Sequence, residues 1–150
     1  MRIAIASDHA AVALKATLAS FLRDLDHEVL DLGPDTDARV DYPDYGYKLA
    51  EAIADGHAER GVALCGSGIG ISIAVNRHPA ARCALVSDPY SAALAREHND
   101  ANVLAMGARL IGEDMAKACL MSFLVGAFGD GRHGGRVDKL SNPTFSRESA

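Results

Sequence analysis

The sequence predicts an α/β protein, a three-layer α/β/α Rossmann-like fold built on a five-stranded, mostly parallel sheet. Short apolar runs of strand length alternate along the chain with longer segments in which apolar residues recur at helical spacing. Strands that alternate with helices pair in parallel, and the helices then cover both faces of the sheet. At 150 residues, 49% of them hydrophobic, the chain can form a sizeable core. We therefore expect a single domain over residues 1–150.

Each expected element has a pattern of its own. The first helix carries Leu14, Leu18 and Leu22 at helical spacing, with Lys15 on the side expected to face water. Proline begins the fourth helix at Pro89, a position that it favours. The expected strands are Arg2–Ser7, Glu28–Leu32, Gly61–Cys65, Arg82–Ser87 and Asn102–Met106. The expected helices are His9–Asp26, Pro43–Ala58, Gly68–Arg77, Pro89–Glu97 and Gly112–Phe128, and a Gly- and Arg-rich tail follows.

Charge and cysteine content narrow the classes of function. The formal net charge of −5 argues against a general role on nucleic acid or at a membrane surface. No apolar run reaches the length of a membrane span, and the first strand begins without a signal-peptide pattern. Cys65, Cys83 and Cys119 are scattered and lack metal-ligand spacing, which indicates a reducing compartment without disulfides. We expect a cytoplasmic protein.

A glycine-rich stretch, Cys65-Gly66-Ser67-Gly68-Ile69-Gly70, joins the third expected strand to its helix. Glycines let the backbone turn sharply and bring its N–H groups close to a ligand, while the helix points its positive end at the same place. This pattern is typical of an anion site, and a helix N-terminus favours the thiolate form of a cysteine. The alternative is a tight turn with a buried, inert cysteine.

Polar residues follow three of the expected strands. They are Ser7-Asp8-His9, Cys65-Gly66-Ser67 and Ser87-Asp88-Pro89. In open parallel sheets, ligands bind beyond the carboxyl ends of the strands, where the strand order reverses. We therefore expect these segments to border the ligand site, although Asp8 has an alternative role as the cap of the first helix.

Six segments of the chain occur in the order found in one enzyme family. They are Ser7-Asp8-His9, Asp41-Tyr42-Pro43, Cys65-Gly66-Ser67-Gly68-Ile69-Gly70, Pro89-Tyr90-Ser91-Ala92, His98-Asn99-Asp100-Ala101-Asn102-Val103-Leu104 and Gly131-Arg132-His133-Gly134-Gly135-Arg136. Together they resemble the ribose-5-phosphate isomerase B family, which includes isomerases of allose and galactose 6-phosphates. The resemblance implies an aldose–ketose isomerase that interconverts ribose 5-phosphate and ribulose 5-phosphate through an enediolate, in the pentose phosphate pathway. It implies neither a cofactor nor a metal.

The resemblance also implies three catalytic residues. Cys65 resembles the family base that takes the C2 proton; some relatives instead have a glutamate at the position of Ile71, which is apolar here. Ser67 stands where many relatives have threonine, which implies a ring-opening role for its hydroxyl. His98 resembles the residue that protonates the ring oxygen, with a capping or core histidine as the alternative. The enediolate would be stabilised by the backbone N–H groups of Gly66, Gly68, Ile69 and Gly70.

The other residues implied by the resemblance bind the sugar and its phosphate. Asp8 and Tyr42 would contact sugar hydroxyls, and Asn99 would help to hold the enediolate. Arg132 and Arg136, in the tail at about 129–150, are four residues apart, so that a helix would aim both at one phosphate. A solvated tail is the alternative. His9 and Arg109 resemble further phosphate contacts. The other histidines, His27, His57 and His78, match no functional position and are expected at the surface.

A homodimer, or a dimer of dimers, with shared active sites is a further implication of the resemblance. His98, Asn99 and Arg109 would face the partner's Cys65, Asp8 and Arg136. The segment Ala116–Phe128 supports an oligomer independently, because it is apolar almost all round and one sheet face cannot bury every side.

Other functions stay open on the sequence. The substrate of an isomerase could be a related sugar 6-phosphate, and a non-enzymatic phosphosugar-binding domain could share the fold. A dinucleotide site would use Gly66, Gly68, Gly70 and Asp88, but the glycine spacing is not G-x-G-x-x-G. A serine hydrolase needs G-x-S-x-G, and Cys65 occupies the first glycine position.

Overall fold

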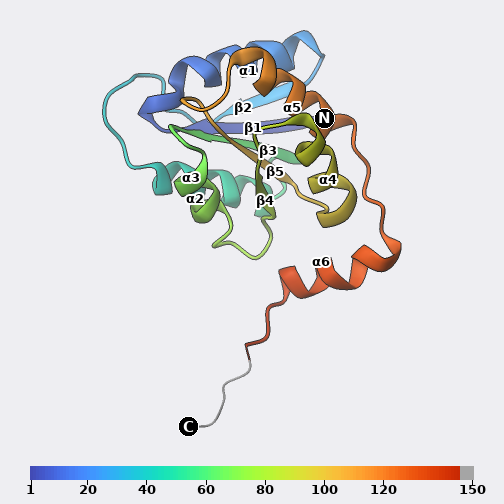
Figure 1. Ribbon diagram of the computed structural model, residues 1–150. Coiled ribbons are helices and arrows are strands. Elements are labelled where there is room, and N and C mark those ends of the chain that lie inside the picture. The colour runs from blue at the N-terminus through green and yellow to red at the C-terminus, as the bar shows by residue number, and fades with distance from the viewer. Residues whose placement is uncertain (146–150) are drawn as a thin grey trace.

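Five strands form one sheet in the computed structural model, which describes residues 1–145 (Figure 1). The strands are β1 (Arg2–Ser7), β2 (Glu28–Asp31), β3 (Arg60–Cys65), β4 (Cys83–Leu85) and β5 (Val103–Gly107). Their order is β2-β1-β3-β5-β4, and every neighbouring pair is parallel. The predicted α/β class and the sheet are confirmed. The last five residues of the predicted phosphate-binding tail, 146–150, lie outside the described residues.

Helices cover both faces of this sheet. They are α1 (Val12–Asp24), α2 (Tyr42–Ala54), α3 (Ile69–Val75), α4 (Pro89–Asn99), α5 (Glu113–Val125) and α6 (Gly134–Ser141), with short 3-10 helices η1 (His9–Ala11) and η2 (Gly131–His133). In Figure 1, α1 and α5 lie on one side of the strands, and α2 and α3 lie on the other. No helix within residues 1–145 is both long enough and apolar enough to cross a membrane.

Two cores follow from the alternation of side chains along each strand. On one face, Ile5 of β1 and Leu64 of β3 pack with residues of α1, α4 and α5, among them Phe123. On the other face, Ala6 and Cys65 pack with α2 and α3. Small strand residues on this second face let α2 and α3 lie close to the sheet, and Cys65 therefore points toward these two helices.

Some helices and strands end at residues other than those predicted, because a local backbone feature sets the observed end. Helix α2 ends at Ala54 rather than at residue 58, because Gly56 follows with φ of 71° and the N–H of His57 bonds to the carbonyl of Ala52. Helix α4 continues to Asn99, where Asp100 adopts φ of 45°. Strand β4 is only three residues long, and it lies at the edge of the sheet with β5 as its single partner.

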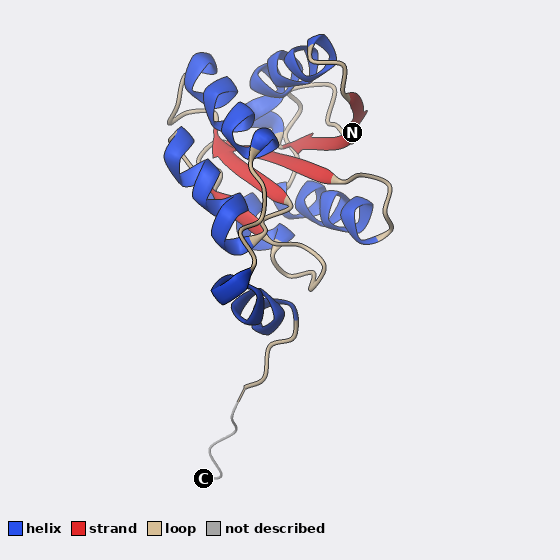
Figure 2. Cartoon of the chain, turned by 90° about the vertical axis from the view of Figure 1, so that its right-hand side faces the viewer, coloured by secondary structure: helices blue, strands red, loops and turns tan. Residues whose placement is uncertain are grey.

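The tail contains a helix, which the sequence analysis raised only through the spacing of Arg132 and Arg136. Helix α6 extends away from the sheet and its covering helices in both views (Figures 1 and 2). Val137 is its buried residue, and Nη1 of Arg82 lies 3.5 Å from Oγ of Ser141. We call residues 129–143 the C-terminal arm, and its few contacts distinguish it from the tightly packed sheet.

Candidate active site

The strand order reverses between β1 and β3, and the predicted glycine-rich loop lies at that point. Strand β1 has β2 on one side and β3 on the other. The chain therefore moves to one side from β1 to β2 and then crosses back past β1 to reach β3. Ligands of open parallel sheets bind in the crevice that such a reversal creates at the carboxyl ends. The N–H of Asp8 donates to the carbonyl of Leu64 (3.0 Å), which holds the ends of the two strands together. We call Asp8, His9, Tyr42 and residues 65–70 the thiol half-site.

Cys65 lies at the end of β3 and is held by the loop that follows. The N–H of Gly68 donates to Sγ of Cys65 at 3.0 Å, and the N–H of Ile69 donates to Oγ of Ser67 at 3.2 Å. Gly68 has φ of 77°, a conformation that side chains disfavour. The thiol, 4% exposed as a residue, is therefore fixed at the N-terminal end of α3, where backbone N–H groups converge.

Close packing of the backbone explains the glycines around this loop. A Cβ on Gly107 would lie 2.6 Å from the carbonyl carbon and oxygen of Ser67, and a Cβ on Gly70 would lie 2.6 Å from the ring of Tyr42. The loop therefore lies directly on β5, and the Tyr42 ring lies directly on the first turn of α3. A cavity of about 260 Å³ borders the loop at Ser67 and Ile69.

Asp8 and His9 are both engaged with the backbone. Oδ1 of Asp8 accepts from the N–H of Ala10 (2.9 Å), which confirms the capping role that was the alternative for this residue. Nδ1 of His9 lies 3.1 Å from the carbonyl oxygen of Val40. That contact occupies Nδ1 and leaves Nε2 as the ring nitrogen for a ligand.

An ion pair between a buried lysine and a partly exposed aspartate, which the sequence analysis missed, supports this side of the site. Lys15 is 3% exposed, so the expectation that it faces water is wrong, and its Nζ lies 2.6 Å from both carboxylate oxygens of Asp31. Oδ1 of Asp31 also accepts from the N–H of Gly33, whose carbonyl accepts from the N–H of Ser7. The pair thus holds the start of the loop that leads to Val40 and Tyr42.

His98 and Asn99 lie at the amino-terminal ends of the strands, opposite the ends that carry Cys65. Helix α4 runs back along the sheet, and its last residues lead into β5 at Val103, which pairs with Gly61 at the start of β3. Cys65 pairs with Gly107 at the other end of the same two strands. A strand rises about 3.3 Å per residue, so the length of β5 separates Cys65 from His98. One chain does not bring these two predicted catalytic residues together.

The arginines of the arm gather with His98 rather than with Cys65. The rings of His98 and His133 stack with centroids 4.4 Å apart, and the N–H of Gly129 donates to the carbonyl of Glu97 at 2.9 Å. Arg132 lies in η2 and Arg136 in α6, both exposed, so they do not share one regular helix as predicted. We call His98, Asn99, Arg132, His133 and Arg136 the imidazole half-site.

Arg109 belongs to the thiol half-site of its own chain. A Cβ on Gly66 would lie 3.3 Å from Nη1 of Arg109, and the N–H of Arg109 donates to the carbonyl of Gly66 at 3.0 Å. The turn after β5 folds back over the glycine-rich loop and brings Arg109 there. Its place opposite a partner's Cys65, Asp8 and Arg136 stays a prediction.

A charged cluster that sequence analysis did not find fixes the end of α4. The carboxylate of Asp100 accepts from Nη1 of Arg96 (2.8 Å) and from Nη2 of Arg82 (2.9 Å). Arg96, 4% exposed, also donates to the carbonyl of Ala101. The positive φ of Asp100 and its two arginines set the direction of the chain just after His98 and Asn99. In the sequence, the sign of this charged cluster is an acidic residue, Asp100, directly after His98 and Asn99.

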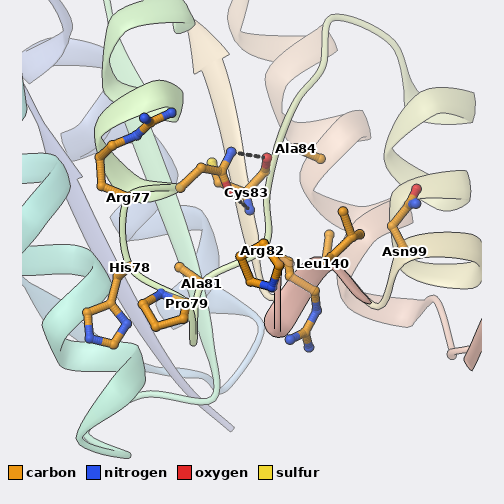
Figure 3. A pocket seen from close by; sticks show the side chains of 12 residues that line it. Arg77, His78, Pro79, Ala81, Arg82, Cys83, Ala84, Asn99 and Leu140 are labelled. Atoms are coloured by element: carbon orange, nitrogen blue, oxygen red, sulfur yellow. Dashed lines mark hydrogen bonds between the residues drawn. The ribbon is translucent and has the colours of Figure 1, made fainter. Parts of the chain in front are cut away.

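A cavity lies beside the arm, away from Cys65. It measures about 650 Å³ and is bordered by the segment 76–84, by Asn99 and Ala101, and by Leu140 and Pro143 of the arm. Figure 3 shows Arg77 and His78 pointing away from one another on its rim, with Cys83 behind.

Burial raises the pKa of the Cys83 thiol to about 12, and burial also raises the pKa of Cys119. All three cysteines are free.

Comparison with known proteins shows the family of this chain. The family model described as Ribose/Galactose Isomerase matches residues 3–140. The chain belongs to the ribose/galactose isomerase family. The predicted resemblance is confirmed at the level of the family, over nearly the whole chain.

Individual members of the ribose/galactose isomerase family are similar over almost their full length. Ribose-5-phosphate isomerase B of Escherichia coli (strain K12) is 40% identical over 93% of this chain and 94% of that protein. D-erythrulose-4-phosphate isomerase of Pectobacterium atrosepticum is 41% identical over 93% of each chain. The structure of Clostridium thermocellum ribose-5-phosphate isomerase B has a TM-score of 0.93 and 45% identity, covering 94% of this chain and 95% of that one.

The remaining histidines in this family member are not uniformly at the surface. His57 is exposed, as expected, but His27 and His78 are half-buried. Nδ1 of His78 accepts from the N–H of Ala80 at 3.1 Å, so this ring holds the turn before β4. For His78 the difference from the expected surface position arises because its side chain caps a turn, which no spacing in the sequence indicates.

Proposed function

We propose that this protein is an aldose–ketose isomerase that interconverts ribose 5-phosphate and ribulose 5-phosphate through an enediolate. The observation that carries the proposal is the thiol of Cys65, held by the N–H of Gly68 at the strand-order reversal and at the start of α3. The relatives named ribose-5-phosphate isomerase B supply the substrate class. The three free thiols fit the reducing cytoplasm, and the reaction belongs to the pentose phosphate pathway.

The proposed reaction moves one proton between two neighbouring carbons. Cys65, as thiolate, takes the C2 proton of the open-chain aldose, and the electron pair forms the enediolate double bond. The thiol then delivers a proton, which can exchange with solvent, to C1, while the proton of the C2 hydroxyl passes to O1, and this gives the ketose. Backbone N–H groups of residues 66–70 hold the negative oxygens, as an oxyanion hole does. Ser67 and His98 serve the earlier opening of the sugar ring, with Asp8 and Tyr42 on the sugar hydroxyls.

We propose further that the active site forms between two chains. Within one chain, His98 and Cys65 lie at opposite ends of β5, so the imidazole half-site of one chain must meet the thiol half-site of another. Exposed apolar residues support a second chain as the cover. They include Ile69, Ile73, Leu85, Leu110, Met115 and Val125. On α5, Met121 and Val125 of the segment 116–128 are exposed, and so is Met115 just before that segment.

Turnover of ribose 5-phosphate tests the function. We expect formation of ribulose 5-phosphate in a coupled assay, with no loss of rate after treatment with a chelator. Allose 6-phosphate and a four-carbon sugar phosphate are assayed beside it, because one relative is named D-erythrulose-4-phosphate isomerase. Faster turnover of another sugar phosphate would move the assignment to that substrate. Binding without turnover of any of them would contradict an isomerase and leave a phosphosugar-binding protein.

Mixed refolding tests the shared site. Inactive Cys65→Ala and inactive His98→Asn chains are unfolded together, refolded, and checked for exchange by mass. Half of the random dimers are mixed, and each mixed dimer has one intact site, so activity should return to roughly a quarter of wild type per subunit. No return of activity would contradict the shared site.

Arg109→Ala provides the matched control for that experiment. Because Arg109 lies at Gly66, it belongs to the same half-site as Cys65. Mixing Cys65→Ala with Arg109→Ala therefore damages both sites of every mixed dimer. We expect no activity beyond that of the two variants refolded separately. Recovery in this control would mean that Arg109 serves the partner's thiol.

A further inference from the structure

His133 lies against His98 in a geometry that the proposed reaction does not yet use. The two imidazole centroids are 4.4 Å apart and the ring planes differ by 12°, so the rings are stacked face to face. The backbone bond from Gly129 to Glu97 holds the start of the arm beside the end of α4. A Cβ on Gly129 would lie 3.9 Å from Cδ2 of His133. The stack is thus supported from both segments.

The charges around the stack favour a neutral ring at His133. Loss of solvent contact lowers the pKa of His133, and the positive groups of His98, Arg132 and Arg136 lower it further, while Glu97 acts in the opposite direction. Nε2 of His98 lies 3.9 Å from Oε1 of Glu97. With its pKa lowered, the ring of His133 places no second positive charge against the face of His98.

We propose that His133 is a positioning residue that holds the imidazole of His98 in the orientation needed to protonate the sugar ring oxygen. This inference rests on the proposed function. His133 lies in the chain between Arg132 and Arg136, so a phosphate bound by these arginines also fixes His133 against His98. Capture of the phosphate and orientation of the ring-opening acid are therefore one event, and a sugar without phosphate leaves the acid without its support.

Two reactions of the same enzyme separate ring opening from proton transfer. Ribose 5-phosphate is mostly a closed ring and has to be opened before Cys65 can act. Ribulose 5-phosphate cannot close a five-membered ring, because its O5 carries the phosphate. Exchange of its C1 proton with deuterium oxide, followed by NMR, therefore reports the step at Cys65 alone. Wild type should catalyse both reactions; if it catalyses neither, the proposed function itself fails.

Variants of His133 and His98 test what the enzyme loses when the two rings no longer stack. We expect His133→Ala to lower kcat for ribose 5-phosphate about tenfold or more with KM changed less than about threefold, and to leave C1 exchange within about twofold of wild type. His133→Phe keeps a flat ring on His98 and should recover most of the lost kcat. His98→Asn should reproduce the pattern of His133→Ala more strongly, and His57→Ala, at an exposed histidine elsewhere, should match wild type.

Three results would overturn the inference. Unchanged turnover of ribose 5-phosphate in His133→Ala would show that His98 needs no support. A rise in KM alone would make His133 a phosphate contact. An equal fall of turnover and C1 exchange in both His133→Ala and His133→Phe would mean that the residue acts on the whole site and not on ring opening.

Discussion

The two half-sites are built in opposite ways. The thiol half-site rests on the ends of two central strands, and its loop lies so close to β5 that Gly107 has no room for a side chain. The imidazole half-site rests on one helix end and an arm that extends from the body of the protein (Figure 2). This difference suits two tasks, because a proton transfer needs atoms held rigidly whereas a phosphate has to be admitted and released.

Loss of the thiol should have the largest effect on activity. We expect Cys65→Ala to lower isomerisation by about 10³-fold or more while the fold and the binding of the phosphosugar persist, because only the base is removed. Cys119→Ala is the matched control, since that thiol belongs to α5 and is buried against the other face of the sheet. Single-turnover assays and circular dichroism measure both variants. Near-normal turnover in folded Cys65→Ala would assign the base elsewhere.

Because the thiol half-site is rigidly packed, we expect one added methyl group there to cause a large loss of stability. Gly107→Ala places a methyl group 2.6 Å from backbone atoms of Ser67, and neither strand nor loop can move aside. We expect the free energy of unfolding to fall by about 3 kcal/mol or more. Gly112→Ala is the control, because a Cβ there meets nothing within 4 Å. Denaturant titration that finds the two variants alike would show the loop to be adaptable.

The charged cluster at the end of α4 tests how firmly the imidazole half-site is anchored. Asp100→Asn leaves Arg96, whose side chain is 5% exposed, without its carboxylate. We expect a loss of about 2–3 kcal/mol in the free energy of unfolding, below the cost at a fully buried pair because Asp100 is partly exposed. Glu28→Gln, which breaks the exposed pair with Arg2, should cost less than about 1 kcal/mol.

The arm should contribute to affinity rather than to stability. We expect Arg132→Ala and Arg136→Ala each to weaken binding of a phosphorylated sugar by about 1.5–3 kcal/mol, the range of a hydrogen bond to a charged group. Lys139→Ala, on the same helix as Arg136, is the control for a lost positive charge. Titration calorimetry with ribose 5-phosphate and with ribose separates the contributions. Equal weakening for both sugars would exclude a phosphate contact.

Replacing Cys83 should have the smallest effect on stability, and only in alkaline solution. Its pKa is raised to about 12 from an ordinary value of 9.0 by burial, so the folded state keeps a proton that the unfolded chain loses. Stability should therefore fall as the pH rises above about 9, and it should be unaffected at neutral pH. In Cys83→Ala this alkaline decline should be shallower, as measured by denaturant unfolding at pH 7, 9 and 10. Parallel curves would show that the thiol titrates normally.

The sequence predicted local patterns well and long-range partners poorly. The strands, the glycine-rich loop and the Asp8 cap depend on residues close together in the chain, and each was found. The Lys15–Asp31 pair joins residues 16 positions apart, and a lysine in an amphipathic helix gave no sign of its own burial.

The same limit applied at the site. The position of Arg109 depends on how the turn after β5 folds over Gly66, and the stack of His98 on His133 depends on the course of the arm. Neither contact has a spacing that a sequence displays. The separation of Cys65 from His98 followed from topology, because a helix that returns along a parallel sheet must end at its opposite edge.

The placement of Cys65 and His98 at opposite ends of β5 has a consequence for dilution. If each working site needs two chains, the fraction of working enzyme follows mass action, and specific activity falls once the protein is diluted below its dimer dissociation constant. A sugar phosphate held between the chains would oppose that dissociation. The enzyme would then stay assembled longest where its substrate is abundant and come apart where it is scarce.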